Sequence, residues 1–391
     1  MKVNQIYELA NDLCAQAYGS EAIKVTSLEG LIAMGDKVLD SSKDKELFAN
    51  ALVDRIGKII IQQRVYAPRL KNILIDSITY GAAIEKVYVE PGDATENEAW
   101  KLDEGTDIGP GTLTKNVVKV KIFDNRNTWK YTSCIPEYQM DSAFTGPSEF
   151  VAFVDSVMNA VNTSLNTAME QMVNMCIANF IGEKIAYATE PTSDSDDTPK
   201  NHGLHAINLL HEYNTATNES LTQESALRNA DFYKFAGRRI HSVLSLMSSI
   251  GVLFNTEGYK RFTDKENLHV LFQTDFAGGM ATYLEADTFH KELVALPNYE
   301  EVPYWQGTGV DGTIEDKTTI NIVTSSGKTV EQSYVIGFAF DNDALGVMFD
   351  HVRQNAWTSP SVDVTKYWFK ADKGYFNDLS ENGVVFYLGE A

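Results

Sequence analysis

Three histidines and a glutamate lie close together near the middle of the chain and are its first candidates for metal chemistry. The histidines are His202, His205 and His211, and Glu212 follows the last of them directly. Imidazole and carboxylate groups are both zinc ligands, but this spacing matches no standard zinc pattern. We therefore predict that the three histidines lie on the surface and that the chain has no metal site.

A short acidic run precedes these histidines. Residues 193–197 have the sequence SDSDD. The calcium-binding loop of an EF-hand needs a glycine and a terminal glutamate at fixed positions, and this run has neither. We predict a solvated loop; weak binding of calcium or magnesium where two copies of the chain meet is the alternative.

Motifs of known catalytic sites are largely missing. The chain has no Gly-x-Ser-x-Gly, no His-Glu-x-x-His and no Walker phosphate loop. The stretches at 278–279 and 307–312 are glycine-rich but lack the strand-turn-helix context of a nucleotide site, so we predict turns there. An acidic hydrolase with paired carboxylates, such as Glu85 or Asp287 with unidentified partners, is the remaining catalytic alternative. We predict that the chain is not an enzyme and has no catalytic residue or cofactor.

The charge balance argues against a dedicated nucleic-acid-binding protein. Lys and Arg number 33 against 54 Asp and Glu, which gives a net charge of −21. A nucleic-acid binder needs a basic face that displaces counterions from phosphates. The same balance is compatible with a wall that encloses a polyanion, because an acidic surface keeps the polymer from adhering.

Cysteine usage and hydropathy bear on the compartment. The cysteines are Cys14, Cys134 and Cys176, an odd number at wide spacing, which favours free thiols and a reducing environment. The N-terminus lacks the apolar core of a signal peptide, and no stretch reaches the roughly 18 apolar residues that a transmembrane helix needs. We predict a soluble protein that is made in a cytoplasm and has no membrane partner.

Helices are predicted over residues 1–62. Apolar side chains such as Leu28, Leu31 and Ile32 recur there near helical spacing. The first of these segments is short and weakly amphipathic. We expect the region to be exposed and this first segment to become ordered only against a neighbour.

Two predicted strands are joined by a long connection. Residues 84–89 and 117–123 read as strands, and Lys119 and Lys121 are expected to face away from the body of the protein. Residues 90–107, between the strands, carry seven acids against one lysine. A connection of about 25 residues is long for a compact domain. We predict an arm that projects from the body; a disordered surface loop is the alternative.

The tip of this arm holds candidate contact residues. Trp100 lies among acids with little local core to join, so burial against a neighbouring chain and local packing both remain open. The acids of the tip would favour a basic patch on that neighbour, for which Lys260-Arg261 is one candidate. The residues that we predict to make contacts between copies are Trp100, Asp103, Glu104, Asp107, Arg238 and Arg239.

The strongest helical pattern covers residues 146–187. Pro147 occupies a first-turn position, and Glu149 lies near the positive end of the helix dipole. The apolar stripe continues for about 40 residues, or about 55–60 Å at the rise of an α-helix. Its opposite face is rich in Asn, Thr and Ser rather than Glu and Lys, which favours packing across a sheet over a coiled coil.

The rest of the chain mixes both kinds of element. The polar segment 189–203 is the best candidate boundary. Residues 204–365 combine helical patterns with short strands such as LHVLFQ (268–273), and the tail alternates as strands do. The predicted fold class is α+β.

The order of these features resembles the capsid fold shared by tailed bacteriophages, the HK97-like fold. That fold also has an extended arm, one long helix and an α/β region closed by C-terminal strands. The stretch YVIGFAFDNDALGVMF (334–349) is similar to the end of the axial domain in many such proteins. The stretch TSPSVDVTKYWFKADKGYFNDLSENGVVFYL (358–388) is similar to their C-terminal strands. The resemblance covers nearly the whole chain.

The resemblance implies five segments. They are an N-terminal helical arm (1–62), the extended β-hairpin arm or E-loop with its base strands (63–135), a peripheral domain with the spine helix 146–187 (136–205), an axial domain (206–365), and C-terminal strands that return to the peripheral domain (366–391).

The resemblance also implies a major capsid protein, which is a structural subunit. Hexamers and pentamers of the chain would form an icosahedral or prolate shell around double-stranded DNA, with the arm of each copy lying over the next. The implied partners are further copies of the chain, a scaffolding protein, a portal protein at one vertex, and packaged DNA without sequence-specific contact. Assembly would take place in the cytoplasm of the bacterial host, and the product would be the virion. An encapsulin-like compartment shell, which shares the fold, is the alternative.

Overall fold

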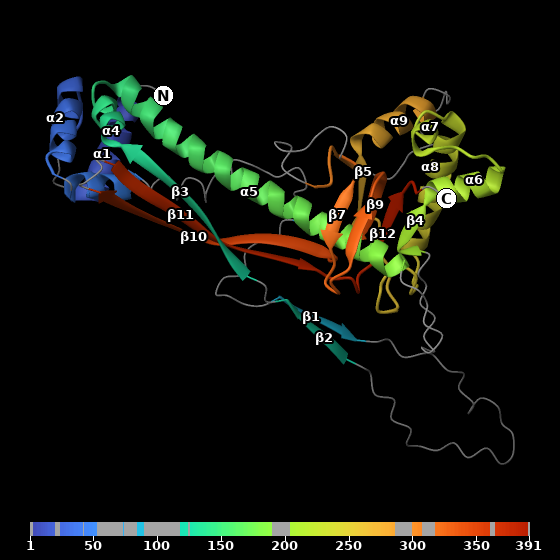
Figure 1. Cartoon of the computed structure of the whole chain (residues 1–391). Coiled ribbons are helices and arrows are strands. Elements are labelled where there is room, and N and C mark those ends of the chain that lie inside the picture. The colour runs from blue at the N-terminus through green and yellow to red at the C-terminus, as the bar shows by residue number, and fades with distance from the viewer. Residues whose placement is uncertain are drawn as a thin grey trace, which may run out of the picture. The chain divides into compact units, whose positions relative to one another are not determined.

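The structure is a computed structural model in which helices and strands both contribute (Figure 1), so the predicted α+β class is confirmed. The described residues are 3–19, 24–41, 43–52, 73, 84–89, 118–123, 126–189, 204–285, 299–306, 317–359 and 364–389. The predictions for Trp100, Asp103, Glu104 and Asp107 lie outside these residues.

Contacts divide the chain into two compact units, and each is made of several separate segments. Unit 1 consists of Met1–Thr79, Arg126–Val173 and Val347–Tyr375. Unit 2 consists of Tyr80–Asn125, Asn174–Gly346 and Phe376–Ala391.

Unit 1 contains the N-terminal helices. Helix α1 covers Val3–Tyr18, α2 covers Leu28–Leu39, and residues 43–52 are also helical. The side chain of Ser27 caps α2 by accepting a hydrogen bond from the backbone N–H of Gly30. The short helix α4, Glu137–Ala143, lies just before the long helix of the chain.

The apolar positions of these helices are buried together. Leu13, Leu31 and Phe48 have no exposed surface. The ring of Phe48 lies 5.5 Å from that of Phe144 and 6.5 Å from that of Phe150, between ring centroids. The expectation that residues 1–62 are exposed is therefore wrong for these positions, because the stripes of several short helices share one core.

A three-stranded sheet completes unit 1. Its order is β10 (Leu345–Ser359), β11 (Val364–Asn377) and β3 (Arg126–Pro136). Strand β11 pairs antiparallel with β3, and Phe369 stands opposite Tyr131. Alternate side chains of β11, including Tyr367 and Phe369, are buried, as in a sheet with one face on the core.

Helix α5 covers Pro147–Thr189, a length of 43 residues. This confirms the predicted long helix, whose first residue is the proline that needs no intrahelical hydrogen bond from its own nitrogen. Its residues up to Val173 belong to unit 1 and the later ones to unit 2. In unit 2 its side chains Phe180, Ile181 and Lys184 have no exposed surface.

Unit 2 is built on a five-stranded sheet. The order is β4 (Ala206–Asn208), β12 (Gly383–Tyr387), β9 (Val335–Asp341), β5 (Leu268–Gln273) and β6 (Glu300–Val302). The central strand β9 pairs antiparallel with both β12 and β5. It is a nearly continuous apolar run because it is buried on both faces. Gly337 in β9 leaves room for the ring of Phe272, since a Cβ there would lie 2.7 Å from Phe272 Cδ1.

Four helices pack with this sheet in unit 2. They are α6 (Leu209–Thr217), α7 (Gln223–Ala226), α8 (Ala230–Met247) and α9 (Thr274–Glu285). Helix α8 begins after Asn229, whose side chain accepts from two backbone N–H groups of the first turn. Its side chains Phe232, Ala236 and Ile240 lie one turn apart and have no exposed surface.

Two hairpins complete unit 2. Strands β1 (Ile84–Val89) and β2 (Val118–Phe123) pair antiparallel and confirm the two predicted strands of the arm (Figure 1). Strands β7 (Ile320–Val323) and β8 (Thr329–Gln332) form a second antiparallel pair.

The C-terminal strands divide between the two sheets. Strand β11 pairs with β3, whereas β12 lies between β4 and β9 in unit 2. The expectation that all of residues 366–391 return to one peripheral domain therefore differs from the structure for β12. The reason is that the GVVFY run of β12 is buried beside the central strand, where an apolar strand is most stable.

Candidate functional site

The arm strands β1 and β2 have two chemically different faces. Successive residues of a strand point to opposite sides, and directly opposed residues of an antiparallel pair share a side. One face therefore carries the opposed pairs Lys86–Lys121 and Tyr88–Lys119. The other face carries the opposed pairs Val87–Val120 and Val89–Val118.

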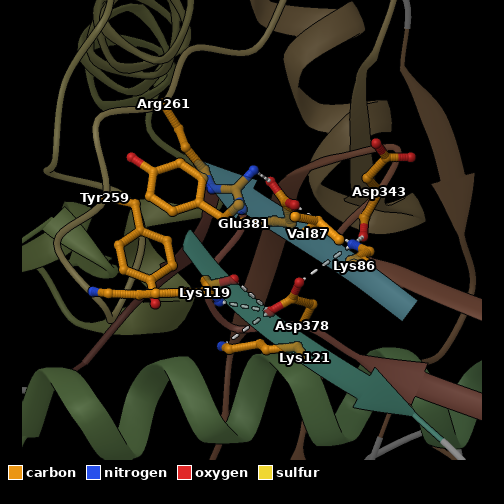
Figure 2. A pocket seen from close by; sticks show the side chains of 11 residues that line it. Lys86, Val87, Lys119, Lys121, Tyr259, Arg261, Asp343, Asp378 and Glu381 are labelled. Atoms are coloured by element: carbon orange, nitrogen blue, oxygen red, sulfur yellow. Dashed lines mark hydrogen bonds and ion pairs between the residues drawn. The ribbon is translucent and has the colours of Figure 1, made fainter. Parts of the chain in front are cut away.

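The basic face contacts two carboxylates that lie between β11 and β12 (Figure 2). Lys86 Nζ lies 3.3 Å from Asp378 Oδ2 and 3.5 Å from Glu381 Oε1. Lys121 Nζ lies 3.3 Å from Asp378 Oδ1 and 3.2 Å from Glu257 Oε1. Asp378 thus joins both arm strands to the same short segment.

Aromatic rings add to this attachment. The ring of Tyr88 stacks on that of Tyr259 with 4.2 Å between centroids and 6° between planes. The guanidinium carbon of Arg261 lies 4.9 Å from the centroid of Tyr88, and Lys119 Nζ lies 4.4 Å from that of Tyr259. Cations at this distance from a ring face are attracted by its quadrupole. We call the residues that hold the arm the arm anchor: Lys86, Tyr88, Lys119, Lys121, Tyr259, Arg261, Asp378 and Glu381.

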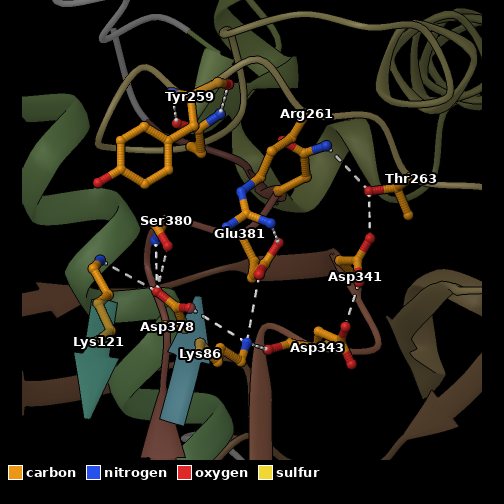
Figure 3. Close-up of polar contacts among 12 residues, drawn as sticks. Lys86, Lys121, Tyr259, Arg261, Thr263, Asp341, Asp343, Asp378, Ser380 and Glu381 are labelled. Atoms are coloured by element: carbon orange, nitrogen blue, oxygen red, sulfur yellow. Dashed lines mark hydrogen bonds and ion pairs between the residues drawn. The ribbon is translucent and has the colours of Figure 1, made fainter. Parts of the chain in front are cut away.

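Asp378 is the most buried charged group of the arm anchor, with 1% of its surface exposed. Its Oδ1 accepts hydrogen bonds from the backbone N–H of Ser380 at 3.1 Å and from the Ser380 hydroxyl at 2.6 Å (Figure 3). Burial alone would raise the pKa of Asp378, but the bonds from Ser380 and the charges of Lys86 and Lys121 outweigh it and lower the pKa. Asp378 is therefore held as a carboxylate.

Glu381 is 6% exposed and pairs with Arg261, whose Nη1 lies 2.7 Å from Glu381 Oε2. Burial raises the pKa of Glu381, although Arg261 and Lys86 oppose the effect. The pKa values of the two acids thus shift in opposite directions although burial raises both, because Asp378 also accepts the hydrogen bonds from Ser380.

A pocket of about 200 Å³ lies against the arm anchor, and its lining includes Asp343 and Ser380 as well. The polar groups around it are largely paired with one another, as Figure 3 shows. Across the residues that the structure describes, no group of three or more His, Cys, Asp or Glu is placed to hold a metal ion. The arrangement is suited to holding the arm at its base rather than to chemical transformation.

The outer face of the arm is apolar and exposed. Val87, Val89, Val118, Val120 and Ile122 are between 49% and 64% exposed. Sequence analysis expected Lys119 and Lys121 to face away from the body, and this is wrong. The lysines face the body because the carboxylates of unit 2 lie there, and the valines are left outside.

The basic pair Arg238-Arg239 lies on α8. The guanidinium group of Arg239 forms two hydrogen bonds with the carboxylate of Glu212, at 2.7 and 2.8 Å. The guanidinium carbon of Arg238 lies 5.9 Å from the ring centroid of Phe235. The structure thus places both side chains near α6 and α8 of their own chain, and their contacts with other copies stay a prediction.

The predicted surface position of the histidines is wrong for His205. It is 1% exposed, and the centroid of its ring lies 4.8 Å from that of Tyr187 in an edge-on arrangement. Its backbone carbonyl accepts from the backbone N–H of Val385 in β12. His211 is exposed on α6, His202 lies outside the described residues, and Glu212 pairs with Arg239 rather than with a histidine.

We expect Glu212→Gln to lower the free energy of unfolding by no more than about 1 kcal/mol. The side chains of Arg239 and Glu212 are 30% and 33% exposed, and exposed ion pairs contribute about 0–1 kcal/mol. Urea titrations of Glu212→Gln, Arg239→Gln and the double variant form a cycle that isolates the pair. A coupling energy above about 2 kcal/mol would contradict this expectation.

Sequence reasoning missed Lys86, Asp378 and Glu381 entirely. The one available signal was the pattern of acids around the last strands, where DLSE (378–381) interrupts two apolar runs. Two acids at a break between buried strands indicate that polar groups lie there. They do not indicate which lysines pair with them.

Among the described residues, no helix combines the length and apolar content that crossing a bilayer requires.

Comparison with solved structures finds capsid proteins. The capsid structure of Staphylococcus phage Andhra aligns with a TM-score of 0.48 and 9% sequence identity, over 83% of this chain and 84% of that chain. The capsid structure of the cyanophage P-SCSP1u aligns with a TM-score of 0.45 and 12% identity, over 82% of this chain and 87% of that chain.

Comparison with curated proteins and families gives a consistent result. The chain is 24% identical over 178 residues to the major capsid protein of Bacillus phage PZA, which covers 44% of this chain and 38% of the relative. It is 20% identical over 200 residues to that of Bacillus phage B103, covering 49% and 43%. These alignments span less than half of the relatives' own length. The profile of the Phi29-like phage major capsid protein family matches residues 10–387, nearly the whole chain. The chain therefore belongs to the Phi29-like phage major capsid protein family.

Proposed function

We propose that the chain assembles with copies of itself into hexamers and pentamers of a closed icosahedral or prolate shell around double-stranded DNA. Membership of a major capsid protein family assigns it a structural role in the phage capsid. The observation that carries the finer proposal is the exposed apolar outer face of the arm, because such a face needs a partner that its own described chain does not supply.

The occupant of this outer face is another copy of the chain. The arm is attached to unit 2 through its basic face, so the apolar face is presented outward by the same contacts. A contact in which the arm of one subunit covers a different surface of the next is heterologous, and such contacts form rings when the rotation between subunits closes. Rings of six and five subunits are the units that a closed shell requires. Trp100, Asp103, Glu104, Asp107, Arg238 and Arg239 are proposed as further contact residues.

We propose that the fold is HK97-like. Unit 1, with the first part of α5, supports the assignment of a peripheral domain, and the five-stranded sheet of unit 2 with its helices supports that of an axial domain. Strands β1 and β2 would be the base of the E-loop. The N-terminal helical arm is proposed for residues 1–62.

The proposed partners follow from a shell that is filled with DNA. They are a scaffolding protein during assembly, a portal protein at one vertex and packaged DNA without sequence-specific contact. The net charge of −21 supports the last point, because an acidic wall does not bind phosphates. Assembly would occur in the bacterial host cytoplasm. The family match favours this shell over an encapsulin-like compartment and over an acidic hydrolase.

Expression of the full chain together with the scaffolding gene next to its own gene tests the proposal. We expect closed particles of uniform size in negative-stain electron microscopy and a matching fast-sedimenting species. The chain expressed alone is the control and should give fewer or irregular particles. A chain that stays monomeric in both cases, at every protein and salt concentration tried, would refute the proposal.

A further inference from the structure

A buried lysine lies directly beneath the arm anchor. Lys184 on α5 has no exposed surface, and its Nζ donates to the backbone carbonyl of Phe254 at 2.7 Å and to that of Glu381 at 3.4 Å. The first carbonyl belongs to the segment that carries Tyr259 and Arg261, and the second belongs to the segment that carries Asp378. One amine therefore links the two segments of unit 2 that hold the arm.

The charge of this amine is set by two opposing effects. Complete burial disfavours the ammonium form and lowers the pKa of Lys184 to about 7, although the negative charges of Asp378 and Glu381 partly offset it. Lysine in water remains charged to far higher pH. Lys184 thus changes its charge within the neutral range.

The arm brings other cations to the same carboxylates. Lys86 and Lys121 lie 3.3 Å from the two oxygens of Asp378. The carboxylates that hold these two lysines are also the ones that attract the ammonium form of Lys184, Asp378 and Glu381. A proton on Lys184 and the basic face of the arm therefore compete for one pair of acids.

We propose that Lys184 couples proton binding to the docking of the arm. Protonation of this amine loosens β1 and β2 from the rest of unit 2, and docking of the arm releases the proton. This inference rests on the contacts within unit 2 and not on the proposed shell. It goes beyond that proposal because it describes a property of the single subunit.

The direction of the pH effect follows from linkage. With the arm docked, Lys184 holds its proton less tightly than with the arm released, when Lys86 and Lys121 no longer neutralise Asp378 and Glu381 and water has access. Docking is then favoured on the alkaline side and weakens as the pH falls towards about 7. Below the pKa of the docked form the amine is protonated in both states, and no further weakening arises from it.

The charges that act on Lys184 come from the segment after β11. They are Asp378 and Glu381, and these two acids pair in turn with Lys86, Lys121 and Arg261. Ordinary carboxylates lose their charge below about pH 5, and ordinary lysine and arginine side chains lose theirs above about pH 10. Free thiols and the α-amino group also have ordinary pKa values between about 7 and about 9, so the variant Lys184→Met is what assigns a response in this range to Lys184.

With the arm docked, some buried polar atoms in the described part of the chain lack hydrogen-bond partners. Among the described residues, the Tyr88 hydroxyl and Arg261 Nε are buried without a hydrogen-bond partner. Such atoms have lost their water without a replacement, which is unfavourable. These atoms offset part of the stabilisation that the arm anchor provides.

The first test measures the reciprocal effect on Lys184 itself. In full-length chain with carbon-13 in its lysine side chains, we expect the Lys184 resonance to titrate with a midpoint near pH 7. In the variant Lys86→Met/Lys121→Met the midpoint should rise by about one pH unit, a tenfold coupling. The exposed-site control Lys234→Met should leave it unchanged. An unchanged midpoint in the double variant would overturn the proposal.

The second test measures the arm. Amide hydrogen exchange of β1 and β2, corrected for the intrinsic pH dependence of exchange, should show less protection at about pH 7 than at about pH 9. Lys184→Met should abolish this difference, and Lys234→Met should retain it. The same loss of protection in Lys184→Met as in the unaltered chain would refute the inference. If Lys184→Met fails to fold, the nuclear magnetic resonance titration decides alone.

Discussion

The double variant Val118→Glu/Val120→Glu is expected to form no closed shells under conditions in which the unaltered chain forms them. The two valines are 56% and 50% exposed on the outer face of the arm. If that face packs against the next subunit, the variant must bury two carboxylates without partners at each contact, at a cost of several kcal/mol. A shell repeats that cost in every subunit.

The same substitutions should barely affect the single subunit. Both positions are exposed and their opposed residues are valines, so neither loses a core contact nor faces another acid directly. We expect the free energy of unfolding, from urea titration, to change by less than about 1 kcal/mol.

The control variant keeps the positions apolar. Val118→Ile/Val120→Ile should assemble as the unaltered chain does, judged by electron microscopy and sedimentation velocity. Closed shells from the glutamate variant in ordinary yield would show that the outer face of the arm is not an interface. Unfolding of the glutamate variant would instead show that this face is buried within its own chain.

Replacement of Asp378 by asparagine is expected to lower the free energy of unfolding of unit 2 by about 3 kcal/mol. Asp378 is 1% exposed and pairs with Lys86 and Lys121. Asparagine keeps the shape and can still accept from Ser380, but it removes a buried charge that offsets two cations. Loss of one partner from a buried ion pair costs about 3–5 kcal/mol, and the partial exposure of the lysines places Asp378→Asn at the lower end.

A matched control is available in unit 1. Asp372 pairs with Arg353, but the two side chains are 25% and 54% exposed, so Asp372→Asn should cost less than about 1 kcal/mol. Equal costs for the two variants in urea titration would show that burial does not determine the strength of the arm anchor.

The cost of Asp378→Asn should also depend on pH. The hydrogen bonds from Ser380 and the lysine charges outweigh burial and lower the pKa of Asp378 in the folded chain. Its contribution to stability is therefore fully present above the ordinary pKa of aspartate, about 3.9, and is lost as the pH falls through the lower folded value. The stability difference between the unaltered chain and Asp378→Asn should narrow in that acidic range.

Local signals were sufficient for the long elements of the chain. The extent of α5 follows from an apolar stripe that Pro147 opens, β1 follows from its β-branched and aromatic residues before Pro91-Gly92, and β2 follows from alternation. Each of these signals lies within the element that it predicts, so no knowledge of the tertiary structure is needed.

The orientation of the arm strands could not be predicted in this way. Alternation separates Lys119 and Lys121 from Val118 and Val120, but it does not say which set faces the body. The deciding partner of Lys121 is Asp378, 257 residues along the chain. Packing of apolar side chains inward is the usual outcome, and here a buried acid on unit 2 reverses it.

Burial of the N-terminal helices and of His205 also depends on partners elsewhere in the chain, so local sequence patterns could not predict it. A weakly amphipathic helix such as α1 is marginal alone, but its apolar positions become core when α2 and the start of α5 lie beside them. The arm anchor is likewise assembled from four separate stretches of sequence, so no single motif could reveal it.

The exposed apolar outer face of the arm has a consequence for newly synthesised copies of the chain. Exposed apolar surfaces of this kind would favour nonspecific association of newly synthesised copies. The surplus of 21 negative charges opposes this, because like-charged molecules repel each other until counterions screen them. If copies assemble as proposed, a higher ionic strength should lower the protein concentration at which they associate.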